Sequence, residues 1–283
     1  IWPLDFPVRR NQLQDVLPLI ALHPGLARKQ ILLHAAQQFP EGDIMQWWHQ
    51  SWEGKTGLGM RNYASDPHLW LPYLVIHYLR GTGDYQILDE RLPFLEGKPI
   101  PRGAEGYVFA PRPSRDADTL YGHCLRAINL TLRRRGHHGL PRMGTGDWND
   151  GLSAVGPRKR GESVWLGFFL YHVLTGFADL AGRREGEAAR ERLLRKAHSL
   201  RRALGSMLRG KRFVRAVTDA GKEMLFADAL TSSWSAISGA ADFEAALAAV
   251  EDGLAELEKE NLVLLLTPAF DENSAPYPGR IAE

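Results

Sequence analysis

Hydrophobic residues recur at helical spacing through most of the chain. Leu13, Val16, Leu17 and Ile20 lie on one face of a helix predicted over 12–22, and the Pro24-Gly25 break separates it from a second amphipathic helix over 26–39. Further helices are predicted at about 65–80, 85–92, 116–135, 162–183, 187–208, 231–238 and 242–260. The pattern therefore predicts an all-α protein.

Strand signals are few. Residues 212–217 and 223–226, turned by Asp219-Ala220-Gly221, predict a small β-hairpin. The helices come in pairs that are joined alternately by short turns and long loops. This alternation suits an α/α toroid, in which the long loops gather at one end and form a cleft. Periodicity alone fits a helical bundle or a solenoid equally well.

Composition narrows the class of protein. With 283 residues, 44% hydrophobic and 24% charged, the chain is expected to be soluble and globular. The net charge of only +2 argues against a nucleic-acid partner. The single cysteine, Cys124, excludes an internal disulfide and is expected to be buried. Polar residues and glycines interrupt the longest apolar stretch, 164–180, so we expect no direct membrane insertion.

The run from Leu140 to Trp165 concentrates the chemistry. Asp147 and Asp150 flank Trp148 and Asn149, and glycines on either side allow close backbone approach. A carboxylic acid can protonate a leaving oxygen, an indole can stack on a sugar ring, and an amide can bind hydroxyls. The alternative is that both aspartates only stabilise a tight turn. The cluster favours a sugar site.

The sequence Gly-Asp-Trp-Asn-Asp-Gly at 146–151 resembles the signature of glycoside hydrolase family 94. This family includes cellobiose and chitobiose phosphorylases and the phosphorylase-like domain of cyclic β-1,2-glucan synthases. The continuation Gly-Glu-Ser-Val-Trp-Leu-Gly at 161–167, which contains Glu162, is most similar to the glucan synthase branch. The resemblance implies an (α/α)6 toroid with Asp150 as the general acid. It also implies that Asp147, Trp148, Asn149 and Glu162 bind substrate.

A segment near the N-terminus extends the resemblance. Arg10 and Asp15 match the ends of the family's Arg-Asp-x-x-Gln-Asp motif, but Asn11 replaces its first Asp. The resemblance implies sugar contacts from both matching residues. From its position alone, Asp15 is better explained as a charged residue on the solvent side of a helix.

A tryptophan-rich stretch resembles two more family motifs. Trp47 and Trp48 match an aromatic motif, and Arg61 and Asp66 match Arg-x-x-x-Ser-Asp-Asp-x-x-Trp, in which Pro67 replaces the second Asp. Any one of these tryptophans could be an ordinary core residue. Together with the Arg and the Asp, they favour a sugar-stacking surface.

The remaining resemblance lies towards the C-terminus. Trp234 matches a family Gln-Ser-Trp segment in which Ser232 replaces the Gln, and it is expected to contact substrate. The family's phosphate-binding histidine motif would follow Glu283. We therefore expect one toroid-type domain over 1–283 that is an incomplete part of a longer architecture. The exposed basic turn 158–160 is expected to be a solvated surface run.

These residues leave three functions open. The first is inverting phosphorolysis of β-linked glucosides or β-1,2-glucan, with inorganic phosphate as co-substrate and no other cofactor. The second is an inverting β-glucan hydrolase with Asp147 or Asp66 as base, and the third is a non-catalytic sugar-binding remnant. No metal site is expected, because His137-His138 lack a Cys or Glu at ligand spacing. We expect a cytoplasmic location, alone or within a membrane-associated synthase, and leave a homodimer open.

Overall fold

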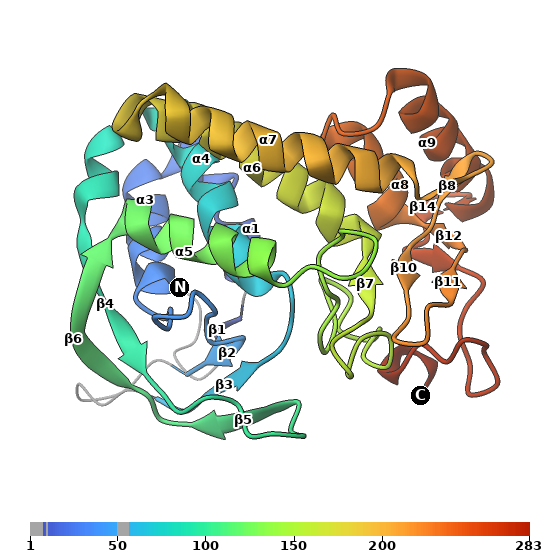
Figure 1. The fold of residues 1–283 in the computed structure, drawn as a ribbon, viewed down its shortest axis with the longest axis horizontal. Helices are drawn as coiled ribbons and strands as arrows, with labels where there is room; N and C mark the ends of the chain where they lie inside the picture. Colours follow the sequence, from blue (N-terminus) through green and yellow to red (C-terminus); the bar gives the residue numbers. More distant parts are fainter. Residues whose placement is uncertain (1–7, 10, 50–56) are drawn as a thin grey trace. The chain divides into compact units, whose positions relative to one another are not determined.

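The computed structural model describes residues 8–9, 11–49 and 57–283. The chain is predominantly helical, with several small sheets (Figure 1). It divides into two compact units, Ile1–Leu130 and Thr131–Glu283. The expectation of a single toroid domain over the whole chain stays a prediction.

The first unit contains five α-helices and two short 3-10 helices among its described residues. They are α1 (Asn11–Asp15), α2 (Leu19–Leu22), α3 (Pro24–Ala35), η1 (Pro67–Leu69), α4 (Trp70–Thr82), η2 (Tyr85–Asp89) and α5 (Leu120–Arg133), whose last turn crosses into the second unit. The prediction of one continuous helix over 12–22 is wrong, because residues 16–18 are not helical. Pro18 lacks an N–H and disfavours helical geometry at the residue before it, so the chain turns between α1 and α2.

Two antiparallel sheets complete the first unit. One has the order β1-β2-β3-β5, and the other pairs β4 with β6. The strands are β1 (Val8–Arg9), β2 (Trp47–Trp48), β3 (Gly59–Asn62), β4 (Arg91–Glu96), β5 (Gly106–Phe109) and β6 (Arg112–Thr119). The helix predicted from residue 116 is therefore wrong at its start. Its first residues pair with β4 instead, and α5 begins at Leu120.

The interior of the first unit is aromatic and apolar. Phe39, Met45, Trp48 and Leu95 form a buried cluster beside the four-stranded sheet. Cys124 lies on α5 with no exposed surface, as the sequence predicted. Burial in this apolar environment raises the pKa of its thiol far above the usual range.

The second unit is built on two long helices that pack side by side (Figure 1). These are α6 (Val164–Glu185) and α7 (Glu187–Gly205), joined at Gly186, whose φ of 93° suits glycine. Two shorter helices follow, α8 (Ala229–Ile237) and α9 (Phe243–Leu257). The predicted pattern of helices is confirmed here to within a few residues.

The predicted hairpin is also confirmed, and a third strand extends it. β10 (Ala216–Val217) pairs with β11 (Glu223–Met224) on one side and with β7 (Glu162–Ser163) on the other. The other elements are β8 (Leu208–Arg209), β9 (Arg212–Phe213), β12 (Ala227–Asp228), β13 (Glu258–Lys259), β14 (Leu262–Val263), β15 (Leu266–Thr267) and η3 (Arg280–Ala282). Because β7 immediately precedes α6, the small sheet fixes where the long helix begins.

One helix in the described part of the chain, α6, has the length and apolar composition of a membrane span. This differs from the expectation that the interrupted run 164–180 is too polar to span a membrane. The most apolar window of α6 is 72% buried within the structure. Burial of this extent is what a core helix shows, and α6 packs against α7 and α8.

Candidate functional site

The signature loop, residues 144–152, folds as two nested turns. The amide of Asn149 donates to Oδ1 of Asp147 (3.0 Å), and the amide of Gly151 donates to Oδ1 of Asn149 (3.0 Å). Each is a side-chain to backbone bond of the type that Asp and Asn make in turns. Gly146 has a φ of 131°, which side-chain-bearing residues rarely adopt. Bonds within the loop therefore help to fix its conformation.

The side chain of Asp147 points inward from the loop and has no exposed surface. Its carboxylate accepts two bonds from Arg215, Nη1 to Oδ2 at 2.6 Å and Nη2 to Oδ1 at 2.8 Å. Ser163 Oγ donates to Oδ2 at 2.6 Å. Burial disfavours the charged carboxylate, but the attraction of Arg215 and these hydrogen bonds outweigh it, so the pKa of Asp147 is lowered.

Arg215 joins the signature loop to helix α8. Its Nε lies 3.2 Å from Oδ1 of Asp228, and both residues are buried. Asp228 caps α8 by accepting from the amide of Thr231 at 2.7 Å. Burial disfavours the charged guanidinium, but the two carboxylates outweigh it and raise the pKa of Arg215.

The sequence analysis missed Arg215, although a signal was present. The residue lies between Val214 and Ala216, in a run of apolar residues that are all buried. A charge within such a run must be paired when buried. The sequence could have indicated a carboxylate partner, but not which one, because Asp147 is 68 residues away along the chain.

Asp150 differs from Asp147 in its surroundings. Asp150 is exposed at the surface of the loop, and Trp148 beside it is half-buried. Asn149 is only 7% exposed, and its side-chain Nδ2 has no hydrogen-bond partner in the described structure. The loop thus has one carboxylate that solvent can reach and one that is enclosed.

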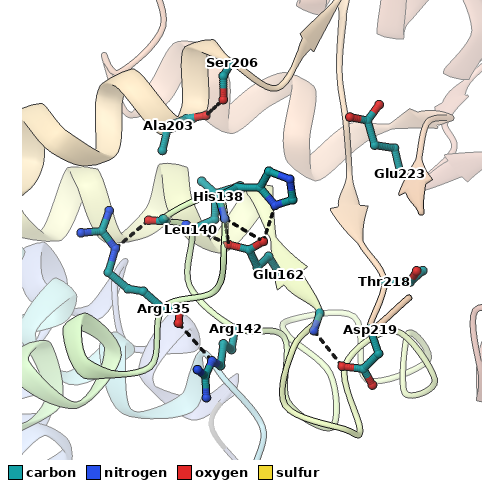
Figure 2. Close-up of polar contacts among 12 residues, drawn as sticks. Arg135, His138, Leu140, Arg142, Glu162, Ala203, Ser206, Thr218, Asp219 and Glu223 are labelled. Atoms are coloured by element: carbon teal, nitrogen blue, oxygen red, sulfur yellow. Dashed lines mark hydrogen bonds and ion pairs between the residues drawn. The ribbon is translucent and has the colours of Figure 1, made fainter. Parts of the chain in front are cut away.

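Glu162 points into the protein rather than towards solvent (Figure 2). Its carboxylate accepts from the amides of His138 and Leu140, each at 3.1 Å, and from Nδ1 of His138 at 2.6 Å. A Cβ at Gly136 would lie 2.3 Å from this carboxyl group, so a larger residue there would force the Glu162 side chain to move. Glu162 therefore holds the turn before the signature loop, and it gives His138 the acidic neighbour that the sequence did not predict.

The basic turn 158–160 is exposed, as expected. Asp219 fixes its backbone, because its carboxylate accepts from the amides of Arg158 (2.6 Å), Arg160 (2.8 Å) and Gly161 (2.8 Å). Figure 2 shows Asp219 next to this turn. The turn is ordered by backbone bonds, and its cationic side chains extend into solvent.

The C-terminal residues bind the other side of the signature loop. The amide of Ile281 donates to the carbonyl of Gly151 (3.0 Å), and Ala154 donates to the carbonyl of Pro278 (3.1 Å). A Cβ at residue 151 would lie 2.6 Å from Cβ of Ile281. The last glycine of the signature is thus required for packing, independently of any ligand.

In the first unit, Arg61 is occupied by protein partners. It is 3% exposed, its Nε and Nη2 donate to Asp43 (2.8 and 2.9 Å), and Nη2 also donates to Glu41 (3.0 Å). Its guanidinium lies 3.8 Å from the ring centroid of Phe39. Burial disfavours the charge, but the bonds to Asp43 outweigh it and the pKa of Arg61 is raised. Arg61 therefore ties β3, an inner strand of the four-stranded sheet, to the segment that carries Glu41 and Asp43.

The aromatic candidates of the first unit are divided between core and surface. Trp48 is 3% exposed and belongs to the core cluster, whereas Trp47 is half-buried against His49, with ring centroids 5.7 Å apart.

The charged candidates of the first unit also differ in burial. Asp66 is buried and accepts from Nε1 of Trp70 (2.8 Å). Asp15 is exposed at the end of α1, which fits its alternative assignment as a solvent-facing charge. The prediction for Arg10 falls outside the described residues.

Trp234 lies on α8 in the second unit and is half-buried. Its ring meets Phe169 and Trp165 of α6 edge to face, with centroids 5.0 and 6.3 Å apart. The indole therefore packs on the long helix. Within the second unit the structure brings Asp147, Trp148, Asn149 and Asp150 into one loop and ties that loop to the start of α8.

Each unit also contains a cavity away from these residues. One, of about 370 Å³, lies between β11 and the segment 268–276, and the other, of about 450 Å³, lies beside β5. None of the described site residues lines either cavity. The geometry of the signature loop, rather than cavity size, therefore identifies the candidate site.

Comparison with known proteins agrees with these features. Residues 8–282 match the family model described as the glycosyl hydrolase 94 superfamily, catalytic domain. Cyclic beta-(1,2)-glucan synthase NdvB of Rhizobium meliloti is 36% identical over 96% of this chain, and solabiose phosphorylase of Paenibacillus borealis is 31% identical over 94%. The chain spans only 10% and 32% of these two relatives.

One solved structure, a rhamnosidase from Klebsiella oxytoca with rhamnose bound, superposes with a TM-score of 0.60. The match covers 92% of this chain and 42% of the rhamnosidase, at 14% sequence identity. At an identity this low, the likeness is evidence for a shared fold only. Together with the helical content, the likeness confirms the predicted α/α-toroid-like fold class.

Proposed function

Because this chain belongs to the glycosyl hydrolase 94 superfamily, we propose that it transfers glucosyl units from β-linked glucosides to phosphate, with Asp150 as the general acid. The observation that carries this proposal is the difference between the two carboxylates of the signature loop. Asp147 is enclosed by Arg215 and Ser163, whereas Asp150 is exposed next to a half-buried indole. A group that exchanges protons with a substrate must be reachable by it.

The proposed reaction uses one acid. Asp150 gives its proton to the glycosidic oxygen as the bond from that oxygen to C1 breaks. A phosphate oxygen forms a bond to C1 from the opposite face, so a β-glucoside yields an α-glucosyl phosphate. Phosphate arrives already ionised, and no second carboxylate is required to activate it. Solvent then returns a proton to Asp150.

Hydrolysis is less well supported, because it needs a carboxylate base for water. The candidates for that base are Asp147 and Asp66, and both are fully buried. Asp147 accepts hydrogen bonds from Arg215, and Asp66 accepts one from Trp70. The proposal therefore assigns Asp147 to positioning the loop instead.

The substrate class rests on the relatives. Their names include a cyclic β-1,2-glucan synthase and a phosphorylase of a β-glucosyl glucuronide. We infer that a β-glucan or a β-glucoside oligosaccharide is the donor sugar. A cytoplasmic location, alone or within a membrane-associated synthase, and a homodimeric assembly are part of the same proposal.

The activity can be tested with β-1,2-, β-1,3- and β-1,4-linked glucosides, each with and without inorganic phosphate. We expect release of α-glucose 1-phosphate only when phosphate is present. Glucose formed without phosphate would instead indicate the hydrolase. Sugar binding by calorimetry without any turnover would indicate the non-catalytic remnant.

The role of Asp150 is tested by Asp150→Asn. Loss of a general acid typically lowers a rate by about 100- to 10,000-fold, so we expect kcat for phosphorolysis of a glucosyl disaccharide to fall by that amount. The matched control is Asp242→Asn, because Asp242 is exposed before α9 and pairs only with Arg201 at the surface. The control should retain its rate, and both variants should keep the wild-type circular dichroism spectrum. Wild-type turnover by Asp150→Asn would remove Asp150 from the role.

A further inference from the structure

Arg215 is the residue through which three separate segments meet. Its side chain is fully buried and bonds both oxygens of Asp147, in the signature loop, at 2.6 and 2.8 Å. Its Nε lies 3.2 Å from Asp228 at the start of α8. We propose that Arg215 is a positioning residue for the general acid and acts on Asp150 through Asp147. This inference rests on the proposed function and adds a residue to it.

The link from Asp147 to Asp150 is short and rigid. Asp147 Oδ1, which accepts from Arg215, also accepts from the amide of Asn149 at 3.0 Å. Asn149 in turn accepts from the amide of Gly151, and its carbonyl accepts from the amide of Leu152. These bonds fix the backbone on both sides of Asp150. A change in where the Asp147 carboxylate sits therefore changes where the acid points.

The backbone of Arg215 is itself fixed. Its amide donates to the carbonyl of Met224 at 2.8 Å, and its carbonyl accepts from the amide of Val164 at 3.2 Å. Arg215 thus lies between the hairpin and the first residue of α6. Ser163, which caps α6 by accepting from Leu166, donates to the same Asp147 carboxylate. The backbone that carries the guanidinium therefore lies directly before β10 and is hydrogen-bonded to β11 and to the first residue of α6.

The geometry calls for arginine rather than any cation. A guanidinium is planar and presents parallel N–H groups that match a carboxylate, and in Arg215 it also forms an ion pair with a second carboxylate, that of Asp228. An ammonium group has no such fork and would keep the charge but not the alignment. Arg215→Lys is therefore the informative variant, because it separates charge from orientation.

A defect in the positioning of an acid has a distinctive kinetic signature. A sugar alcohol is a poor leaving group and needs a proton as the C1–O bond breaks, whereas a dinitrophenolate leaves as a stable anion. Misplacing Asp150 should therefore impair transfer from a disaccharide to phosphate much more than transfer from a dinitrophenyl β-glucoside. A general loss of folded protein would lower both rates equally.

The experiment compares Arg215→Lys with Arg212→Lys on the full chain, using both donors with phosphate. Arg212 lies three residues away and pairs with Asp252 and Glu256 at a part-exposed position, so it is a matched control. For Arg215→Lys we expect kcat on the disaccharide to fall at least about 100-fold, because a general acid contributes a rate enhancement of about 100- to 10,000-fold. On the aryl glucoside, whose leaving group needs no proton, we expect kcat to fall less than about 10-fold. Arg212→Lys should change neither rate by more than about 2-fold, as surface ion pairs are weak.

A second measurement does not depend on turnover. Hydrogen exchange of the amides at 149–152 should accelerate in Arg215→Lys and stay unchanged in Arg212→Lys. Equal losses of rate on both donors, or unchanged exchange in the loop, would overturn the positioning role. If the wild type shows no phosphate-dependent turnover, the proposed function fails, and loop exchange still decides whether Arg215 orders the loop.

Discussion

At the scale of single residues, burial decides what each aspartate of the signature loop can do. The Asp147 carboxylate is desolvated, which disfavours its charge, yet the pairing with Arg215 keeps its pKa below the usual range. Breaking a buried pair by removing one partner typically costs about 3 to 5 kcal/mol, because the other charge stays buried and unpaired. Asp147 is therefore a residue on which the stability of the second unit depends.

This lowered pKa predicts acid sensitivity with a definite sign. A carboxyl group whose pKa is lower in the folded state adds stability that is fully present above its unfolded value of about 3.9 and is lost as pH falls through the folded value. In urea titrations at pH 7, we expect Asp147→Asn to lower the free energy of unfolding by about 3 to 5 kcal/mol. The difference from wild type should shrink below about pH 4. A difference that stays constant from pH 7 to pH 3 would contradict the assignment.

At the scale of secondary structure, the start of α6 is where the fold and the site are coupled. Ser163 ends β7 and is the N-cap of α6, because its Oγ accepts from the amide of Leu166 at 3.0 Å. The same hydroxyl donates to Asp147. One side chain thus begins the long helix and also holds the signature loop against it.

Ser163→Ala should therefore remove two contacts at once. A lost N-cap costs about 1 kcal/mol, and a lost hydrogen bond to a charged carboxylate costs about 1.5 to 3 kcal/mol more, so we expect a total loss of about 2.5 to 4 kcal/mol in unfolding free energy. The control is Ser206→Ala, because Ser206 is exposed after α7 and its hydroxyl donates to the backbone carbonyl of Ala203 (Figure 2). The control should change stability by less than about 0.5 kcal/mol. Equal effects of the two variants, measured by urea unfolding, would show that the Ser163 contacts contribute nothing.

At the scale of the whole molecule, each unit has its own buried charged network. Arg61 bonds Asp43 and Glu41 within the first unit, and Arg215 hydrogen-bonds Asp147 and forms an ion pair with Asp228 within the second. The residues named in one network do not occur in the other. Neither network therefore requires the other for its hydrogen bonds.

Independence of the networks predicts additive effects on stability. Effects of substitutions that share no partners usually add within about 0.5 kcal/mol. We expect the Arg61→Lys, Asp147→Asn double variant to lose as much unfolding free energy as the two single variants lose together, within that margin. The test is urea unfolding of the wild type, both single variants and the double variant, monitored by fluorescence and circular dichroism. A departure above about 1 kcal/mol would show that the networks are coupled.

The sequence predicted those features that local pattern controls. The long helices α6, α7 and α9 were found from their apolar spacing, and the hairpin from its turn residues. The local pattern failed at Pro18, which splits a helix, and at β6, where pairing with β4 overrides any local preference.

The candidate site divides in the same way. Residues 147–150 were identified from a contiguous motif and lie together in one loop. The Arg215 partner of Asp147 and the His138 partner of Glu162 depend on contacts between segments far apart in the chain. Such pairings leave no periodic trace, although a lone charge in an apolar run indicates that a partner must exist.

The burial of Cys124 has a practical consequence for work on this protein. The chain has one native thiol, which has no exposed surface and whose pKa burial keeps high, so little thiolate forms in the folded state. A fluorophore or spin label directed at an added surface cysteine would therefore attach at that position alone. The native chain already has the background that site-specific spectroscopy requires.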